Sequence, residues 1–328
     1  AALSGNSDIW RANLLGGERL LTFVQRLRGF RTLGHYAAER QWNSGEGYIA
    51  GQKGISRPAA HIVGQQLLPT KALSATGLNR SALTKVPKAP IKDPKSEARF
   101  TPPLLLVKEH QDLYNAMWEE SYLTYKHEIV GFAAPKKDLK RLRQVRDWIA
   151  NNLPALQAYV ASTSIRLFTQ RATSIASADI MAIPYPEDGS LDLSDNEQIL
   201  VDDVVRYWRD FVRTGSDSDV MKLDGREALP AFAASFTAQI NTVYPTTPLL
   251  ALPAQSWPGI ICQPFVFGAG QVDWTGVDEL RGRLDNLLRE QRGSSITVTR
   301  IARIYDGKFV FLLKPDRLRY WLRSIALR

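Results

Sequence analysis

The chain has very few residues of the kinds that bind metals or form disulfides. Among 328 residues there is one cysteine, Cys262, so no internal disulfide can form, which is typical of proteins from a reducing compartment. Because Pro264 and Phe265 follow it closely, we expect Cys262 to be a buried core thiol rather than a nucleophile. The histidines show no His-Glu-x-x-His pattern, so the sequence predicts no metal site. They are His35, His61, His110 and His127.

Long apolar runs are also missing. No stretch reaches the roughly 18 apolar residues that cross a bilayer, and Arg11 and Asn13 interrupt the only candidate for a secretory signal. We therefore expect a cytoplasmic protein with no membrane partner. The chain starts at Ala1 and ends at Arg328 within a predicted helix, so we also expect a fragment of a longer protein.

Common signatures of catalysis are missing as well. An amino-methyltransferase places a polar residue, two prolines and an aromatic residue around the target amine, and the segment 101–104 has only the prolines. The glycine pairs at 45 and 47 and at 268 and 270 are not followed by the lysine of a phosphate-binding loop. No Gly-x-Ser-x-Gly elbow occurs. The sequence predicts no catalytic residue and no cofactor bound by this chain.

A carboxylate site is the nearest alternative. Magnesium-dependent nucleases align two carboxylates and a lysine on adjacent strands, but Val107-Lys108-Glu109 has these residue types in the wrong order. His110 with Glu109 and Asp112 could join a carboxylate cluster. We expect the simpler arrangement, in which these residues form an exposed strand end.

Charge is plentiful and unevenly distributed. The formal net charge is +9. Residues 1–100 hold 15 Lys and Arg against 6 Asp and Glu, and residues 276–328 hold 12 against 6, whereas residues 151–275 hold 7 against 14. A basic region beside an acidic one indicates a surface for a polyanion and another surface kept away from it. An ordinary solvated surface is the alternative.

The first part of the chain alternates between helical and strand-like patterns. Residues 8–40 form a basic amphipathic pattern that predicts a connector helix, broken at Gly29 or Gly34. The apolar runs 103–110 and 128–135 predict two strands at the centre of a sheet, and 136–159 has helical spacing. The Lys- and Pro-rich segment 85–103 predicts an extended surface loop.

The segment 178–208 reads as the exit from a domain. A strand is predicted over 166–183, and Pro184 and Pro186 end it because proline removes backbone donors. Ser194 or Asp195 can then cap an amphipathic helix over 195–214.

The length suggests about two domains, and the patterns predict an α+β fold. An Ala-rich piece at 231–240 leads to a Pro-rich linker, and the tail reads β-α-β-β-α with an Asp306-Gly307 hairpin turn. We predict a connector helix (1–40), a mixed-sheet domain with flanking helices (41–190), a helical spacer and linker (191–255) and a small α+β domain (256–328).

Taken in order, several of these segments resemble the part of bacterial N6-adenine DNA methylases that follows the catalytic domain and includes the target-recognition region. The segments that carry the resemblance are 10–33, 45–54, 100–110, 129–135 and 179–186. The resemblance implies sequence-specific binding of double-stranded DNA in a restriction-modification or phage-defence system. It also implies that a methyltransferase domain using S-adenosylmethionine precedes Ala1, and that other restriction or defence subunits are partners.

The residues proposed to bind DNA are basic or polar and lie in predicted loops or at a predicted helix start. Glycines beside Lys53 and Arg57 allow close approach to a groove, and arginine can pair bidentately with guanine. The basic residues at the start of the helix predicted over 136–159 would contact phosphates. The full set is Lys53, Ser56, Arg57, Lys88, Lys92, Lys108, Lys136, Lys137, Lys140, Arg141 and Arg143. The alternatives are a stand-alone specificity subunit that docks on a separate methylase, a nuclease with an unrecognised site, and a protein-binding scaffold.

Overall fold

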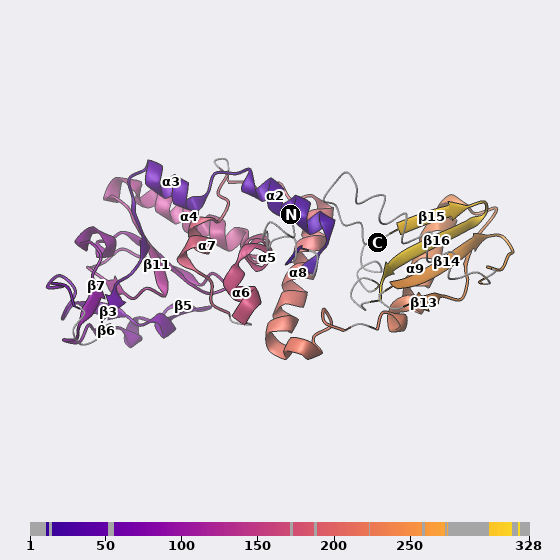
Figure 1. Ribbon diagram of the computed structural model, residues 1–328. Coiled ribbons are helices and arrows are strands. Elements are labelled where there is room, and N and C mark those ends of the chain that lie inside the picture. The colour runs from indigo at the N-terminus through magenta and orange to yellow at the C-terminus, as the bar shows by residue number, and fades with distance from the viewer. Residues whose placement is uncertain are drawn as a thin grey trace, which may run out of the picture. The chain divides into compact units, whose positions relative to one another are not determined.

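The fold combines helices with open sheets, which confirms the predicted α+β class (Figure 1). The computed structural model describes residues 11–12, 15–51, 56–170, 173–186, 189–222, 224–257, 260–272, 274, 302–316 and 321. Two compact units are present. The central unit is Thr22–Val205, and the terminal unit joins Ala1–Leu21 to Arg206–Arg328.

An antiparallel sheet in the order β1-β11-β8-β9 organises the central unit. Its strands are β1 (Asn43–Glu46), β8 (Leu104–Lys108), β9 (Asn115–Trp118) and β11 (Ile129–Ala133). The two apolar runs predicted to be central strands are β8 and β11, and they pair in the middle of this sheet. All five residues of β11 are buried, as a continuous apolar run requires.

The helices of the central unit include α3 (Leu33–Glu39), α4 (Leu139–Asn151), α5 (Leu153–Thr163), α6 (Ile165–Gln170) and α7 (Ser177–Met181). α3 contacts β1, and α5 packs against α4. α4 contacts β8 and β9, whereas α7 contacts β1 and β11. The apolar residues Leu142, Val145, Trp148 and Ile149 of α4 are buried and Leu139 is partly buried, so this amphipathic helix turns its basic side to solvent.

Short strands complete the central unit and make its sheets mixed, because β10 pairs parallel with β3 and β3 pairs antiparallel with β6. They are β2 (Ile49–Ala50), β3 (Gln66–Leu68), β4 (Leu73–Ser74), β5 (Gly77–Leu78), β6 (Thr84–Lys85), β7 (Ile91–Asp93) and β10 (Thr124–Tyr125). Short 3₁₀ turns lie between them: η1 (Thr70–Ala72), η2 (Arg80–Ala82) and η3 (Glu97–Phe100).

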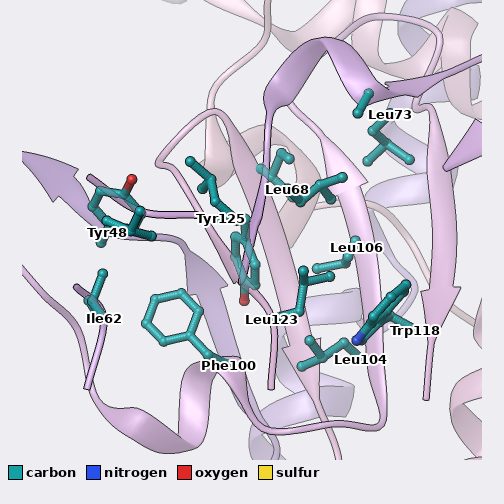
Figure 2. Packing of buried hydrophobic residues seen from close by; sticks show 14 of the residues in the cluster. Tyr48, Ile62, Leu68, Leu73, Phe100, Leu104, Leu106, Trp118, Leu123 and Tyr125 are labelled. Carbon is teal, nitrogen blue, oxygen red and sulfur yellow. The ribbon is translucent and has the colours of Figure 1, made fainter. Parts of the chain in front are cut away.

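Tyr125 is the largest fully buried side chain of the apolar core shown in Figure 2. Its ring meets Phe100 edge to face at 5.2 Å, and its hydroxyl donates to the Arg99 carbonyl at 2.9 Å. The ring lies against Gly131 of β11, where any side chain would occupy the same space. The backbone of Tyr125 lies in the same way against Gly47. These two glycines leave the space that the tyrosine fills.

The interpretation of 85–103 as a surface loop outside the core is wrong. This segment contains β7 and η3, and it places Ile91 and Phe100 in the core, each at most 2% exposed. Val86 belongs to the same core, so a few buried apolar side chains anchor a segment whose other residues are mostly polar.

The strand predicted over 166–183 is also wrong, because α6 and α7 occupy this region. The carboxylate of Asp179 accepts hydrogen bonds from the Ala176 amide at 2.8 Å and the Ser164 hydroxyl at 2.7 Å. The first of these bonds satisfies a backbone donor at the start of α7, which stabilises a helical turn over the extended form.

Two predicted helices are divided in the structure. The connector pattern gives α2 (Glu18–Arg28) and α3, and the break lies at Gly29, since Gly34 is inside α3. The pattern over 136–159 gives the 3₁₀ turn η4 (Lys136–Asp138), α4 and α5, with the division at Asn152 and Pro154 within the first turn of α5.

The Pro-Tyr-Pro exit is anchored by its tyrosine. The Tyr185 ring packs edge-on against Tyr36 at 4.6 Å and Trp148 at 5.0 Å. The chain then forms α8 (Asp195–Thr214), whose bounds are those predicted. Ser194 caps it reciprocally, because the Ser194 amide donates to Glu197 Oε2 at 3.0 Å and the Glu197 amide donates to Ser194 Oγ at 3.3 Å.

The terminal unit has an antiparallel sheet in the order β12-β14-β16-β15, with β13 also paired to β14. Its elements include η5 (Gly215–Asp217), η6 (Arg226–Ala228), α9 (Leu229–Val243), β12 (Leu249–Ala251), β13 (Gln255–Trp257), β14 (Ile260–Phe267), β15 (Ala302–Asp306) and β16 (Phe309–Pro315). The predicted hairpin at Asp306-Gly307 is confirmed. The Pro-rich segment predicted as a linker instead supplies β12 and β13. The helices predicted over 277–291 and 316–327 lie outside the described residues, apart from Asp316 and Trp321.

Cys262 on β14 is 1% exposed, and burial raises the pKa of its thiol to about 12. The expectation of an inert core thiol is therefore confirmed. Within the described part of the chain, no helix combines the length and apolarity needed to cross a membrane.

Candidate nucleic-acid interface

The predicted DNA-binding residues that the structure describes lie at three places in the central unit. Lys53 falls outside the described residues. The largest group, which we name the α4 cluster, occupies η4 and the first turns of α4. It consists of Lys136, Lys137, Lys140, Arg141 and Arg143, all exposed.

The α4 cluster is basic and solvent-facing for a local reason. Leu142 and Val145 turn inward onto the sheet, so the residues between them along the helix point outward. Lys136, Lys137 and Lys140 form no ion pair with any described residue. Among the described residues, the cluster therefore presents three ammonium groups without an ion-pair partner, although the charge of Lys137 acts on the nearby Asp138 carboxylate.

The two arginines of the cluster are held by carboxylates. Arg143 donates from Nε and Nη2 to both oxygens of Glu119, at 3.0 and 2.7 Å, and this bidentate bond raises the pKa of the arginine. Arg141 donates from Nη1 to Asp138 Oδ1 at 2.6 Å. Since both arginine side chains are about half exposed, their remaining donors stay accessible to a ligand.

Asp138 positions Arg141, and sequence reasoning did not find it. Its side chain is buried, and its second oxygen accepts a hydrogen bond from Trp42 Nε1 at 3.1 Å. The Trp42 bond, followed by the one from Arg141, holds the pKa of the Asp138 carboxyl below its usual value. Trp42 and Asp138 are 96 positions apart, so no local pattern could have linked them.

An open pocket of about 450 Å³ lies beside the α4 cluster. Its lining residues are Glu39, Arg40, Gln41, Lys137, Asp138 and Arg141. The Arg40 guanidinium lies over the Tyr36 ring, 3.7 Å from its centroid, which restricts the side chain. Sequence reasoning missed Arg40 and Gln41, because they follow α3 and reach the α4 cluster only through the fold.

A second basic group lies at β7 and the segment that pairs with it. It consists of Ser56, Arg57, Lys88 and Lys92, all exposed. The Arg57 amide donates to the Ile91 carbonyl at 2.8 Å, which brings Arg57 next to β7 and Lys92. Lys95 bonds to Asp93 at 2.7 Å, and this bond, supported by the nearby charge of Arg57, lowers the pKa of Asp93.

Lys108, at the end of β8, differs from the other predicted contacts. Its ammonium donates to the Leu73 carbonyl at 3.3 Å and lies 5.7 Å from the centroid of the Tyr114 ring. The side chain is half-buried. Lys108 thus has internal partners, in contrast to the lysines of the α4 cluster.

Two carboxyl groups meet where β8 ends. Glu109 is 9% exposed, and burial, followed by the negative charge of Glu46, raises its pKa to about 7. Arg166 Nη1 is 3.4 Å from Glu109 Oε2, and the Ser177 hydroxyl donates to Glu46 Oε1 at 2.6 Å. Glu109 therefore holds a proton at neutral pH much more often than an ordinary glutamate.

His110 is not the exposed strand end that we expected, because its side chain is only 19% exposed. Its ring stacks on Tyr114 at 4.7 Å, and Nδ1 accepts a hydrogen bond from the Asp112 amide at 3.2 Å. Burial lowers the pKa of His110. Among the residues that the structure describes, no group of three or more His, Cys, Asp or Glu side chains could hold a metal ion.

No protein-family model matches the chain, and a comparison with characterised proteins finds no significant match. The α4 cluster is therefore the main feature of the chain that bears on its function.

Proposed function

We propose that this chain binds double-stranded DNA sequence-specifically, as the target-recognition part of an N6-adenine DNA methyltransferase in restriction-modification or phage defence. The observation that carries the proposal is the α4 cluster, in which the exposed lysines Lys136, Lys137 and Lys140 project from one helix start and form no ion pair within the described part of the chain. Such a group is suited to the closely spaced phosphates of a duplex.

The two basic groups suit different parts of DNA recognition. A rigid helix start anchored by Asp138 fits contacts to phosphates, which fix orientation but carry little sequence information. Ser56 and Arg57 lie on an exposed segment beside β7, where a guanidinium can reach a guanine edge and pair bidentately. We assign phosphate contacts to the α4 cluster and base contacts to Arg57, Ser56, Lys88 and Lys92.

The proposal includes the chemistry and partners that the resemblance implies. The methyltransferase domain, which uses S-adenosylmethionine, would be a separate domain or partner of this chain. Other restriction or defence subunits complete the proposed assembly, which would operate in the cytoplasm. No residue of this chain is proposed to transfer the methyl group.

The α4 cluster is tested by the salt dependence of DNA binding. Replacing Lys136, Lys137 and Lys140 by alanine should make the slope of log affinity against log salt shallower by about 3, because each phosphate contact contributes about 0.9. Titrations of a fluorescent duplex at several salt concentrations give the slope. Lys71→Ala, an exposed lysine on η1, is the control and should leave the slope unchanged. An unchanged slope in the triple variant would remove the α4 cluster from the interface.

The assignment of Arg57 to base reading has a separate test. Arg57→Ala should weaken binding to duplexes selected from a random library about tenfold, and binding to random duplexes much less. Equal weakening for both duplex classes would contradict base reading and place Arg57 on a phosphate.

A further inference from the structure

The pocket beside the α4 cluster is surrounded by more cations than anions. Three cations line it: Arg40, Lys137 and Arg141. The anions of the lining are Glu39 and Asp138, and Glu39 is also paired with Arg31, which does not line the pocket. The lining therefore carries one excess positive charge around a pocket of about 450 Å³.

The two carboxylates are already engaged by the protein. Both Asp138 oxygens accept hydrogen bonds, one from Trp42 and one from Arg141. Glu39 Oε2 accepts from Arg31 Nη1 at 2.7 Å and is 3.9 Å from Arg40 Nη1. Lys137 has no such partner among the described residues. An anion entering the pocket would meet two arginines held by carboxylates and one ammonium group that forms no ion pair with a described residue.

The backbone adds positive potential at the same place. Asp138 is the N-cap residue of α4, but its side chain makes no capping hydrogen bond, because Trp42 and Arg141 occupy both of its oxygens. The amide of Leu139, the first residue of this 13-residue helix, donates instead to the Lys136 carbonyl of η4. The pocket thus lies at the start of a helix, where the helix dipole adds positive potential.

Gln41 on the pocket wall has an unusual backbone. Its φ is +57°, in the left-handed region. The Gln41 amide donates to the Ala38 carbonyl and the Trp42 amide to the Ala37 carbonyl, both at 2.9 Å, so α3 ends in a Schellman motif. Glycine is the usual residue at this position, because other residues are strained there. Here the position instead carries an amide side chain that lines the pocket.

We propose that this pocket binds one phosphate group, held by Arg40, Lys137 and Arg141, with the side-chain amide of Gln41 as an additional hydrogen-bond donor. This inference rests on the proposed function, because the bound phosphate would belong to the DNA backbone. A phosphate fixed in a pocket sets the register of the duplex, whereas contacts of an exposed lysine with the backbone do not.

The test compares two lysines that the proposal separates. Lys137 lines the pocket and Lys140 does not, although both are exposed and belong to the α4 cluster. Duplexes carrying one neutral methylphosphonate at successive positions are titrated with the full chain. We expect one position to weaken binding about tenfold, because a charge-assisted contact is lost there. In a plot of affinity loss against methylphosphonate position, this position forms a peak, which we call the methylphosphonate peak. The peak should disappear in Lys137→Ala and persist in Lys140→Ala, because Lys140→Ala only lowers the overall affinity.

Gln41→Gly controls for folding. The change relieves the left-handed backbone, so the variant should melt at the same temperature as the natural protein or higher. It should nevertheless reduce the methylphosphonate peak. A stable Gln41→Gly variant with an undiminished peak would exclude the amide from the site.

Titrations with inorganic phosphate and with a 5′-mononucleotide, followed by amide chemical shifts at the pocket, separate the two proposals. Duplex binding without a position-specific peak would overturn the pocket and leave the proposed function standing. Shifts that saturate and depend on Lys137, without duplex binding, would support the pocket with free phosphate as its ligand and overturn the proposed function. If neither duplex nor phosphate binds, both proposals fail.

Discussion

Replacing Gly131 with alanine is expected to lower the free energy of unfolding of the central unit by about 3 kcal/mol or more. A Cβ at this position would overlap the hydroxyl and ring of Tyr125. Neither side can move easily, because Gly131 pairs with Leu106 and Gly45 in the middle of the sheet, and the Tyr125 hydroxyl is bonded to the Arg99 carbonyl. Urea denaturation followed by tryptophan fluorescence measures this decrease in the free energy of unfolding.

Gly64→Ala is the matched control. Gly64 has a φ of +80°, and a Cβ there would meet nothing within 4 Å. Gly64→Ala should lower the free energy of unfolding by about 1 kcal/mol, and only because of the left-handed backbone. The loss in Gly131→Ala comes only from steric overlap with Tyr125. Equal losses in the two variants would show that Tyr125 does not fill the space beside Gly131.

Glu109→Gln should make the protein more stable than the natural one at pH 8.5 by about 2 kcal/mol, with little difference at pH 5. The folded pKa of Glu109 is about 7, above its ordinary value of 4.5. The folded state therefore holds the proton more tightly, and the associated stability is complete below pH 4.5 and lost as pH rises through 7. Glutamine imitates the protonated form at every pH.

Urea midpoints measured from pH 5 to 8.5 test this expectation. The groups that face Glu109 are Glu46, Arg166 and Glu128, and loss of the proton brings its charge against that of Glu46. Glu120→Gln, at an exposed side chain, is the control and should leave the pH profile unchanged. Parallel profiles for the natural protein and Glu109→Gln would contradict a proton held at position 109.

Elements with strong local signals were predictable from the sequence. β8 and β11 are continuous apolar runs bounded by polar residues, and such runs are buried wherever they lie in a sheet. α8 has apolar residues at helical spacing and a serine cap, so both its type and its bounds follow from neighbouring residues.

The region before α8 was not predictable in this way. The apolar run at 179–183 is too short to distinguish a strand from a buried helical turn. The choice is made by Asp179, whose carboxylate also accepts a hydrogen bond from Ser164, fifteen positions earlier. A tertiary contact therefore outweighed strand propensity.

The candidate site also has one part that was predictable from local sequence and one part that was not. The α4 cluster follows from consecutive residues at one helix start and was predicted. The pocket combines Arg40 and Gln41 with Lys137 and Arg141, and the carboxyl pair at the end of β8 joins Glu46 to the buried Glu109. These groups meet only after the sheet forms, so no spacing in the sequence signals them.

Labelling of Cys262 by a thiol reagent measures local opening of the terminal unit. Cys262 is the only thiol, it lies in the core of the terminal unit, and the central unit contains none. A thiol reagent can modify it only when that core opens, since the folded thiol is both inaccessible and protonated. Labelling rates therefore follow the terminal unit alone, while tryptophan fluorescence reports on both. Comparing the two signals in Gly131→Ala would show whether damage to one unit is felt by the other.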